Sequence, residues 1–215
     1  MTSPPKLAPA DDFYLAAHDG IGGRALLPER VLGVGLAASL IGELMFWRRL
    51  LVDGDLLHVV DATPTTDPAT AAVLQRMTGR GPYSIGQWIG YFATGAEEHV
   101  QRRLVVAEVL RPETKRRLLG AGTTTLVFTD PKSPGEPAGR IRTHLSYNED
   151  LDTADLMLAG LILATGLDAF VLDTCNPRDR ARLSDQFRRR MPPPLAQLVA
   201  HTRATAADAV PAAAG

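Results

Sequence analysis

The chain has a single cysteine, Cys175, among its 215 residues. One cysteine excludes a disulfide framework and a cysteine-based zinc site, and it is typical of a protein from a reducing compartment. The five histidines are scattered, and none forms the H-E-x-x-H pattern that puts two metal ligands on one face of a helix. We therefore expect neither a disulfide nor a metal site.

An excess of charge of one sign is also missing. The 23 basic and 24 acidic residues leave a formal net charge of −1. A chain with this balance has no global basic field for nucleic acid or membranes. Any such contact must therefore use a local patch of the surface.

Long apolar runs are absent as well. The longest strongly apolar stretches without a charged residue are residues 31–42 and 156–167. Each is well short of the roughly 20 residues that a membrane-spanning helix needs. No apolar run follows the first six residues, so we expect no signal peptide. These features predict a cytoplasmic protein without a membrane span.

Catalytic motifs are missing too. The sequence contains no G-x-S-x-G nucleophile elbow and no phosphate-binding Walker loop, and the adjacent acids Glu97 and Glu98 diverge on a helix. Residues 33–38 match the G-x-G-x-x-A dinucleotide pattern, but they lie inside a helical pattern and no strand-like run precedes them. We interpret these small residues as sites of close helix packing. The sequence predicts a protein that is not an enzyme and has no cofactor.

Apolar residues make up 45 % of the chain and gather in two helical patterns. In residues 31–47 and 154–172 apolar side chains occur nearly all round the helix, which is typical of buried helices. Glu43 is the one acid inside the first pattern, and a buried acid needs a partner. Further helices are predicted around this pair at residues 11–18, 69–77, 97–110, 178–191 and 195–206.

Two short hairpins are predicted between the helices. Asp53-Gly54 joins two apolar runs and is a strong hairpin signal. The β-branched and aromatic run 123–129 predicts a strand, and the alternating run 140–145 is its expected partner. The whole pattern predicts a mainly α fold with two buried central helices, surrounding amphipathic helices and a projecting β-hairpin. We place this single domain at residues 7–206, with flexible tails at 1–6 and 207–215.

Arginine clusters and one apolar strand are the remaining candidates for function. Arginine forks bind phosphate with two hydrogen bonds, although such clusters also occur as solvated faces paired with acids. The clusters are Arg48-Arg49, Arg102-Arg103, residues 115–117 and residues 188–190. In the strand, Leu126, Val127 and Phe128 either belong to the core or contact a bilayer surface or a sister subunit.

Several short motifs follow one another between residues 7 and 198. They are the double acid Asp11-Asp12 with Leu15, the helix motif Leu40-Ile41-x-Glu43-Leu44, the element Gln87-Trp88-Ile89, the basic run Gln101-Arg102-Arg103-Leu104, the strand 126–128 and the apolar helix 158–168. In this order they resemble the Golgi phosphoprotein 3 family, which includes bacterial members. The resemblance implies one mostly helical domain with a projecting hairpin. It also implies peripheral membrane association through a phosphoinositide headgroup, phosphatidylinositol 4-phosphate in the eukaryotic members.

The residues of the family pocket differ in this chain. The family uses a tryptophan before the central helix, an arginine within it and two arginines on the later basic helix. Those positions fall on Pro28, Ala37, Glu98 and Gln101. The candidates left for a lipid headgroup are the nearby Arg30, Arg102 and Arg103. We therefore expect weak, salt-sensitive binding to anionic lipid instead of selective binding to phosphatidylinositol 4-phosphate.

The leading hypothesis is a non-enzymatic protein at the inner face of the membrane. Its expected partners are an anionic phospholipid or phosphoinositide headgroup, a membrane-protein tail, and a second copy of the chain bound through the hairpin. One alternative is a winged-helix nucleic-acid binder, with helices at 97–110 and 113–119 and a wing at 123–145, although the net charge of −1 argues against it. The other alternative is a soluble interaction scaffold without lipid binding.

Overall fold

The computed structural model describes residues 7–20, 22–115 and 123–210. Its longer helices are α1 (Pro9–Ala16), α2 (Glu29–Phe46), α3 (Pro68–Met77), α4 (Ile85–Ala93), α5 (Ala96–Val106), α6 (Glu136–Ser146), α7 (Thr153–Ala164), α9 (Pro177–Arg190) and α10 (Pro193–Ala209). Shorter helical turns are η1 (Ser133–Gly135) and α8 (Asp168–Val171). The strands are β1 (Leu50–Asp53), β2 (Leu56–Val59), β3 (Tyr83–Ser84), β4 (Leu110–Lys115) and β5 (Thr123–Phe128). The predicted mainly α class is confirmed.

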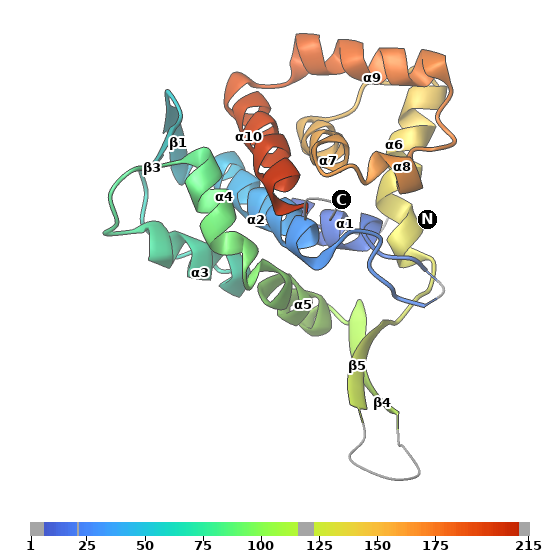
Figure 1. Cartoon of the computed structure of the whole chain (residues 1–215), viewed down its shortest axis with the longest axis horizontal. Helices are drawn as coiled ribbons and strands as arrows, with labels where there is room; N and C mark the ends of the chain where they lie inside the picture. Colours follow the sequence, from blue (N-terminus) through green and yellow to red (C-terminus); the bar gives the residue numbers. More distant parts are fainter. Residues whose placement is uncertain (1–6, 21, 116–122, 211–215) are drawn as a thin grey trace, which may run out of the picture.

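Helix α2 is the centre of the fold (Figure 1). Its residues from Val31 to Leu44 are all buried, and α1, α3, α4, α5, α7 and α10 pack around it. Small residues allow this close approach. A Cβ at Gly33 would collide with the backbone carbonyl of Ala93, and a Cβ at Gly35 would collide with the ring of Phe13. The G-x-G-x-x-A segment is therefore a helix-packing surface, as we predicted.

Helix α7 is the second buried helix, but it is shorter than predicted. The sequence predicts one helix over residues 154–172, whereas α7 ends at Ala164 and α8 follows after a break. Gly166 has a φ of 73°, a left-handed conformation that ends helices and that glycine adopts without a steric penalty. The amide of Leu167 then bonds back to the carbonyl of Ile162 at 3.0 Å. Because the apolar run continues past Ala164, the apolar pattern of the sequence does not show this helix end.

The last helix enters the segment that we predicted to be a flexible tail. Helix α10 runs to Ala209, and both Ala206 and Ala209 are buried. The helix packs against α2, α4 and α7, and it continues three residues beyond residue 206, where we predicted its end. The rest of the predicted tails, residues 1–6 and 211–215, lies outside the described residues.

The first hairpin is confirmed and the second has a different partner strand. β1 pairs antiparallel with β2 across Asp53-Gly54, and β3 extends this sheet. β5 pairs antiparallel with β4, from Leu110 opposite Phe128 onward. Residues 140–145, the predicted partner, lie instead in α6. Their two apolar residues, Ile141 and Leu145, are four positions apart and both buried, which is a helical spacing.

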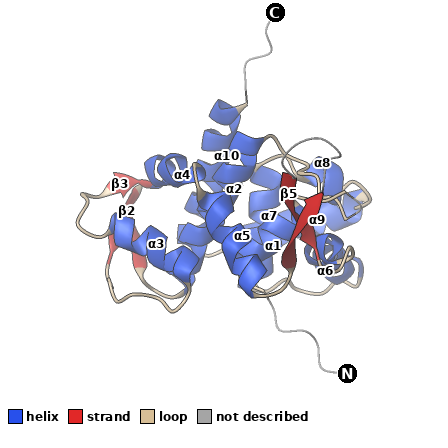
Figure 2. Cartoon of the chain, turned by 90° about the horizontal axis from the view of Figure 1, so that it is seen from below, coloured by secondary structure: helices blue, strands red, loops and turns tan. Residues whose placement is uncertain are grey.

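The β4–β5 hairpin projects from the helical body below α5 (Figure 1). The β1–β3 sheet lies at another end of the molecule, as the view from below shows (Figure 2). Leu110 is buried at the root of the hairpin, and Leu126 and Phe128 pack against the core. Residues 116–122, which join the two strands, lie outside the described residues. Among the described helices, none is both long and apolar enough to cross a membrane.

Candidate functional site

Arg103 lies in an internal cluster of ion pairs, away from the surface. Its Nε binds Asp11 at 2.8 Å, its Nη1 binds Asp67 at 3.0 Å, and its two terminal nitrogens bind the two oxygens of Glu43 at 2.9 and 3.0 Å. These carboxylates come from α1, the turn before α3, and α2. Glu43 also accepts a hydrogen bond from the amide of Ala10 at 2.8 Å. The buried acid thus has its partner, and Arg103 connects α5 to the centre of the fold.

The two adjacent acids of α1 bind two different arginines. Asp11 pairs with Arg103, whereas Asp12 pairs with Arg140 of α6 at 2.6 Å. Arg140 also pairs with Asp155 of α7 at 2.8 Å. Burial raises the pKa of Asp11 to about 7, against the opposing charge of Arg103. The double-acid motif is therefore an internal structural element that ties α1 directly to α5 and α6 and, through Arg140, to α7.

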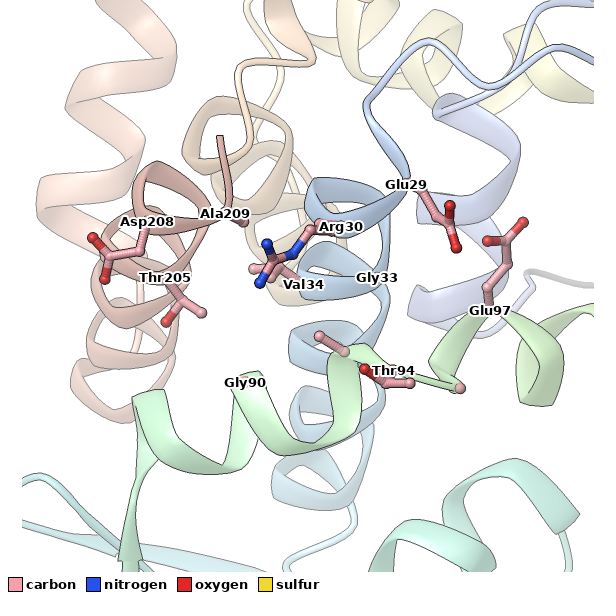
Figure 3. A pocket seen from close by; sticks show the side chains of 12 residues that line it. Glu29, Arg30, Gly33, Val34, Gly90, Thr94, Glu97, Thr205, Asp208 and Ala209 are labelled. Atoms are coloured by element: carbon pink, nitrogen blue, oxygen red, sulfur yellow. The ribbon is translucent and has the colours of Figure 1, made fainter. Parts of the chain in front are cut away.

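Arg30 lines a cleft between α2, α4 and α10, and this cleft is predominantly acidic. The cavity has a volume of about 290 Å³ and is also lined by Glu29, Glu97 and Asp208. Figure 3 shows Arg30 with Asp208 on one side of it and the carboxylates of Glu29 and Glu97 close together on the other. Burial and the charge of Glu29 raise the pKa of Glu97. Three carboxylates around one arginine disfavour an anionic headgroup.

A second cleft, which we call the α3–α5 cleft, has the opposite balance of charge. It has a volume of about 410 Å³ and lies between α3, α4 and α5, where Arg76, Tyr91, Glu98, His99 and Arg102 are among its lining residues. Arg76 donates a hydrogen bond to the hydroxyl of Tyr91 at 3.3 Å.

Arg80 extends this basic surface. Its guanidinium lies 5.1 Å from the centre of the Tyr91 ring, in a cation–π arrangement. We call the exposed Arg76, Arg80 and Arg102, with the half-buried His99, the basic face.

A family model for Golgi phosphoprotein 3 (GPP34) matches residues 10–207, which is most of the chain. The chain belongs to the Golgi phosphoprotein 3 family. A comparison with curated proteins finds no match. The resemblance inferred from the order of the motifs is therefore confirmed, and the described helices and hairpin agree with the fold that it implies.

The four positions that the sequence resemblance assigns to the family pocket have other surroundings in the structure. Pro28 precedes α2 as its N-cap, and Ala37 is fully buried. Gln101 donates hydrogen bonds to the hydroxyl of Tyr14 at 3.2 Å and to Glu97 at 2.9 Å. Glu98 lines the α3–α5 cleft. None of the four supplies a cation or an aromatic ring for a headgroup.

The three predicted headgroup arginines also do not converge. Arg30 lies in the acidic cleft, Arg102 lies in the α3–α5 cleft, and Arg103 is occupied by three carboxylates. We therefore correct the role of Arg103: it is an internal ion-pair residue. Adjacent residues on a helix point about 100° apart, so Arg102 is exposed although Arg103 is not.

The basic face was not found by sequence reasoning, because Arg76 and Arg80 stand alone in the sequence. A weak signal existed for Arg76. Helix α3 buries Ala69, Val73 and Met77, and a helical wheel drawn on this spacing places Arg76 at the edge of the apolar stripe, next to Ala69. Nothing local indicated that Arg80 would stack on Tyr91.

The apolar strand residues help to anchor the hairpin. Leu126 and Phe128 are half-buried and pack against the core. The ring of Phe128 lies 6.3 Å from that of Tyr14 and 5.9 Å from that of His18. This contact favours the core interpretation for Leu126 and Phe128, while Val127, opposite Arg111, is half-buried.

The winged-helix alternative loses the geometry on which it depended. Residues 113–115, the start of its second helix, belong to β4. The second part of its wing, residues 136–145, is helix α6 and not a returning strand. The structure therefore contradicts this hypothesis.

The remaining arginine clusters are paired with acids or lie outside the described part of the chain. Arg49 pairs with Asp61, and both Arg188 and Arg189 pair with Asp185. Residues 116 and 117 belong to the undescribed segment. In the described residues, no group of three or more His, Cys, Asp or Glu side chains is placed to hold a metal ion.

Proposed function

We propose that this protein is a non-enzymatic peripheral membrane protein that binds anionic lipid surfaces through the basic face. Two observations support the proposal. The chain belongs to a lipid-binding family. The basic face also brings together three exposed arginines in a chain whose net charge is only −1: Arg76 and Arg102 line the α3–α5 cleft, and Arg80 stacks on Tyr91 at its edge. The second observation carries the proposal, since it supplies the local patch that such a chain needs.

The charges of the basic face are available to a membrane. Arg76 and Arg80 form no ion pair with a described carboxylate. Arg102 pairs with Glu98 at 3.1 Å, but both side chains are more than half exposed, at 63 % and 72 %. Such a pair is worth little and exchanges readily. The acidic cleft around Arg30 offers no comparable surface.

The proposed binding is weak and salt-sensitive. Each arginine close to an anionic membrane contributes about 1 kcal/mol, and this attraction falls off within a Debye length. Because the residues at the family's pocket positions are replaced, we do not expect this protein to recognise the inositol ring. The proposed location is the cytoplasmic face of the membrane, where anionic lipids are exposed.

A vesicle flotation experiment tests this proposal. Phosphatidylcholine vesicles with phosphatidylserine are incubated with the wild-type chain and with the variant Arg76→Gln/Arg102→Gln. We expect the double substitution to weaken binding by up to about 30-fold, the equivalent of about 2 kcal/mol. The matched control is Arg188→Gln/Arg189→Gln, which removes the same charge from exposed positions of α9.

The outcome distinguishes lipid binding from the scaffold hypothesis. If the wild-type chain does not float with anionic vesicles, the soluble scaffold is favoured. If the α9 control loses as much binding as the Arg76/Arg102 variant, net charge and not the basic face determines the attraction. Self-association through the hairpin and binding of a membrane-protein tail remain predictions.

A further inference from the structure

We propose that the α3–α5 cleft is a binding site for a phosphate monoester group. The guanidinium groups of Arg76 and Arg102 bind the phosphate oxygens, and the ring of Tyr91, on which Arg80 stacks, lines the cleft beside them. This inference deepens the proposed function and rests on it for the membrane-bound source of the ligand. It adds the chemical group that the basic face recognises.

The charge balance of the cleft points to a dianion. The positive charge of the cleft comes from Arg76 and Arg102, while Glu98 is the single carboxylate among the described lining residues. His99 also lines the cleft, and because its pKa is lowered it is mostly neutral near neutral pH. The acidic cleft on the other side of α4 has the reverse composition, with one arginine and three carboxylates. A phosphate monoester carries a charge of about −1.5 to −2 near neutral pH. It is therefore the common biological group that matches two guanidinium groups most closely.

The shape of the cleft favours one bound phosphate group over loosely associated counterions. Its floor includes the buried apolar side chains Leu40, Val73 and Phe92. Charges above such a low-dielectric floor interact more strongly than they do in water. The volume of about 410 Å³ lies in the range of ordinary ligand sites, roughly 300–1,000 Å³.

The start of α5 adds to the positive potential in the same place. Thr94, Gly95 and Ala96 line the cleft, and the N-cap Gly95 has no side chain to accept the first amide hydrogens of α5. Helix N-termini attract anions for this reason. The hydrogen bond from Arg76 and the charge of Arg80 lower the pKa of Tyr91, and burial and the charge of Arg102 lower that of His99.

Two sources could supply the phosphate group, and the experiment separates them. For a soluble source, glycerol 3-phosphate is titrated into the full chain, and the ring resonances of Tyr91 and His99 are followed by NMR. For a membrane source, flotation compares vesicles of equal surface charge that carry phosphatidic acid, phosphatidylinositol 4-phosphate or phosphatidylglycerol. The first two lipids end in a phosphate monoester and the third contains a diester alone.

We expect saturable shifts at Tyr91 and His99, and equal binding to the two monoester lipids above that to phosphatidylglycerol. Arg76→Gln should weaken the binding of glycerol 3-phosphate at least tenfold, whereas Arg188→Gln should leave it unchanged. Arg76 is exposed, so unchanged thermal unfolding checks that the variant is folded.

The two experiments distinguish failure of the phosphate site from failure of the proposed membrane binding. Equal binding to all three anionic vesicles without response to glycerol 3-phosphate leaves the proposed function standing and overturns the phosphate site. Saturable binding of glycerol 3-phosphate that Arg76→Gln abolishes, without flotation on any vesicle, supports the site and removes its membrane source. If Arg76→Gln does not weaken the binding of glycerol 3-phosphate, the ligand binds elsewhere and the inference is also overturned.

Discussion

Replacing Arg103 by methionine should strongly destabilise the fold. Methionine keeps the length and much of the apolar volume of the side chain but removes its charge and its hydrogen bonds. The side chains left behind are Glu43, Asp11 and Asp67, which are 1 %, 6 % and 17 % exposed. They would lose the guanidinium that each of them contacts within 3.0 Å.

The size of the effect follows from this burial. Removing one partner of a buried ion pair leaves an uncompensated charge and costs about 3–5 kcal/mol. A domain has a total stability of about 5–15 kcal/mol, so the loss is a large share of it. For a chain of this length, the melting temperature should fall by about 6–20 °C.

The neighbouring position provides a matched control. Arg102→Met makes the same substitution one residue earlier on α5 and removes an exposed pair with Glu98. Its cost should be below about 1 kcal/mol. Both variants are measured by urea unfolding followed by circular dichroism.

The relation between the two variants tests the reasoning. If Arg103→Met costs no more than Arg102→Met, then Arg103 is not the counterion of the buried acids. A further check is Glu43→Gln/Arg103→Met, which removes the most buried carboxylate together with its partner. This double variant should be more stable than Arg103→Met alone, because less charge remains uncompensated.

Three further predictions concern the core and its titration. Leu40→Ala should lower the free energy of unfolding by about 2–5 kcal/mol, because Leu40 is fully buried; a loss below about 1 kcal/mol would place it at the surface. Gly35→Ala should destabilise by about 1–3 kcal/mol through its clash with Phe13, whereas Gly90→Ala, with open space around it, should be neutral or stabilising in urea unfolding. Burial raises the pKa of Asp11 from 3.8 to about 7. Between these values the folded chain binds more protons than the unfolded chain, so the contribution of Asp11 to stability falls as the pH rises from about 4 to 7. Asp11→Asn should remove this fall, and an unchanged slope would contradict the assignment.

The parts of the fold that the sequence predicts are those with a strong local pattern. Residues 31–47 are apolar on every face, and a helix with that pattern has to be buried wherever it lies. Asp53-Gly54 between apolar runs fixes a hairpin turn. The need of Glu43 for a partner also follows from the sequence alone, because an unpaired buried carboxylate is too costly.

Choices between partners depend on tertiary contacts and could not be made from the sequence. Two segments that neighbour β5 in the sequence could form its partner strand. The segment that we predicted as the partner contains Ile141 and Leu145, and their spacing also fits a helix. The segment that forms β4 has no strand pattern in the sequence, because Pro112 and its charged neighbours are poor strand formers. In the structure Phe128 of this hairpin packs on Tyr14 of α1, a tertiary contact that no local pattern shows.

The site was predicted least well, for the same reason. The sequence does not distinguish Arg102 from Arg103 within the basic run. Their different roles depend on where α1 and α2 place Asp11 and Glu43. The basic face joins Arg76 and Arg80 to Arg102 across two helices. A cluster of this kind is formed by folding and leaves no contiguous motif.

We propose that local positive charge holds this protein on anionic membranes. The most direct measurement is flotation of the wild-type chain with phosphatidylserine vesicles and with neutral phosphatidylcholine vesicles, at about 0.1 M and about 1 M salt. The Debye length shortens from about 10 Å to about 3 Å between these conditions. The account predicts binding to the anionic vesicles at the lower salt concentration, release at the higher one, and no binding to neutral vesicles. Binding that persists at about 1 M salt, or that is equal on neutral vesicles, would contradict it.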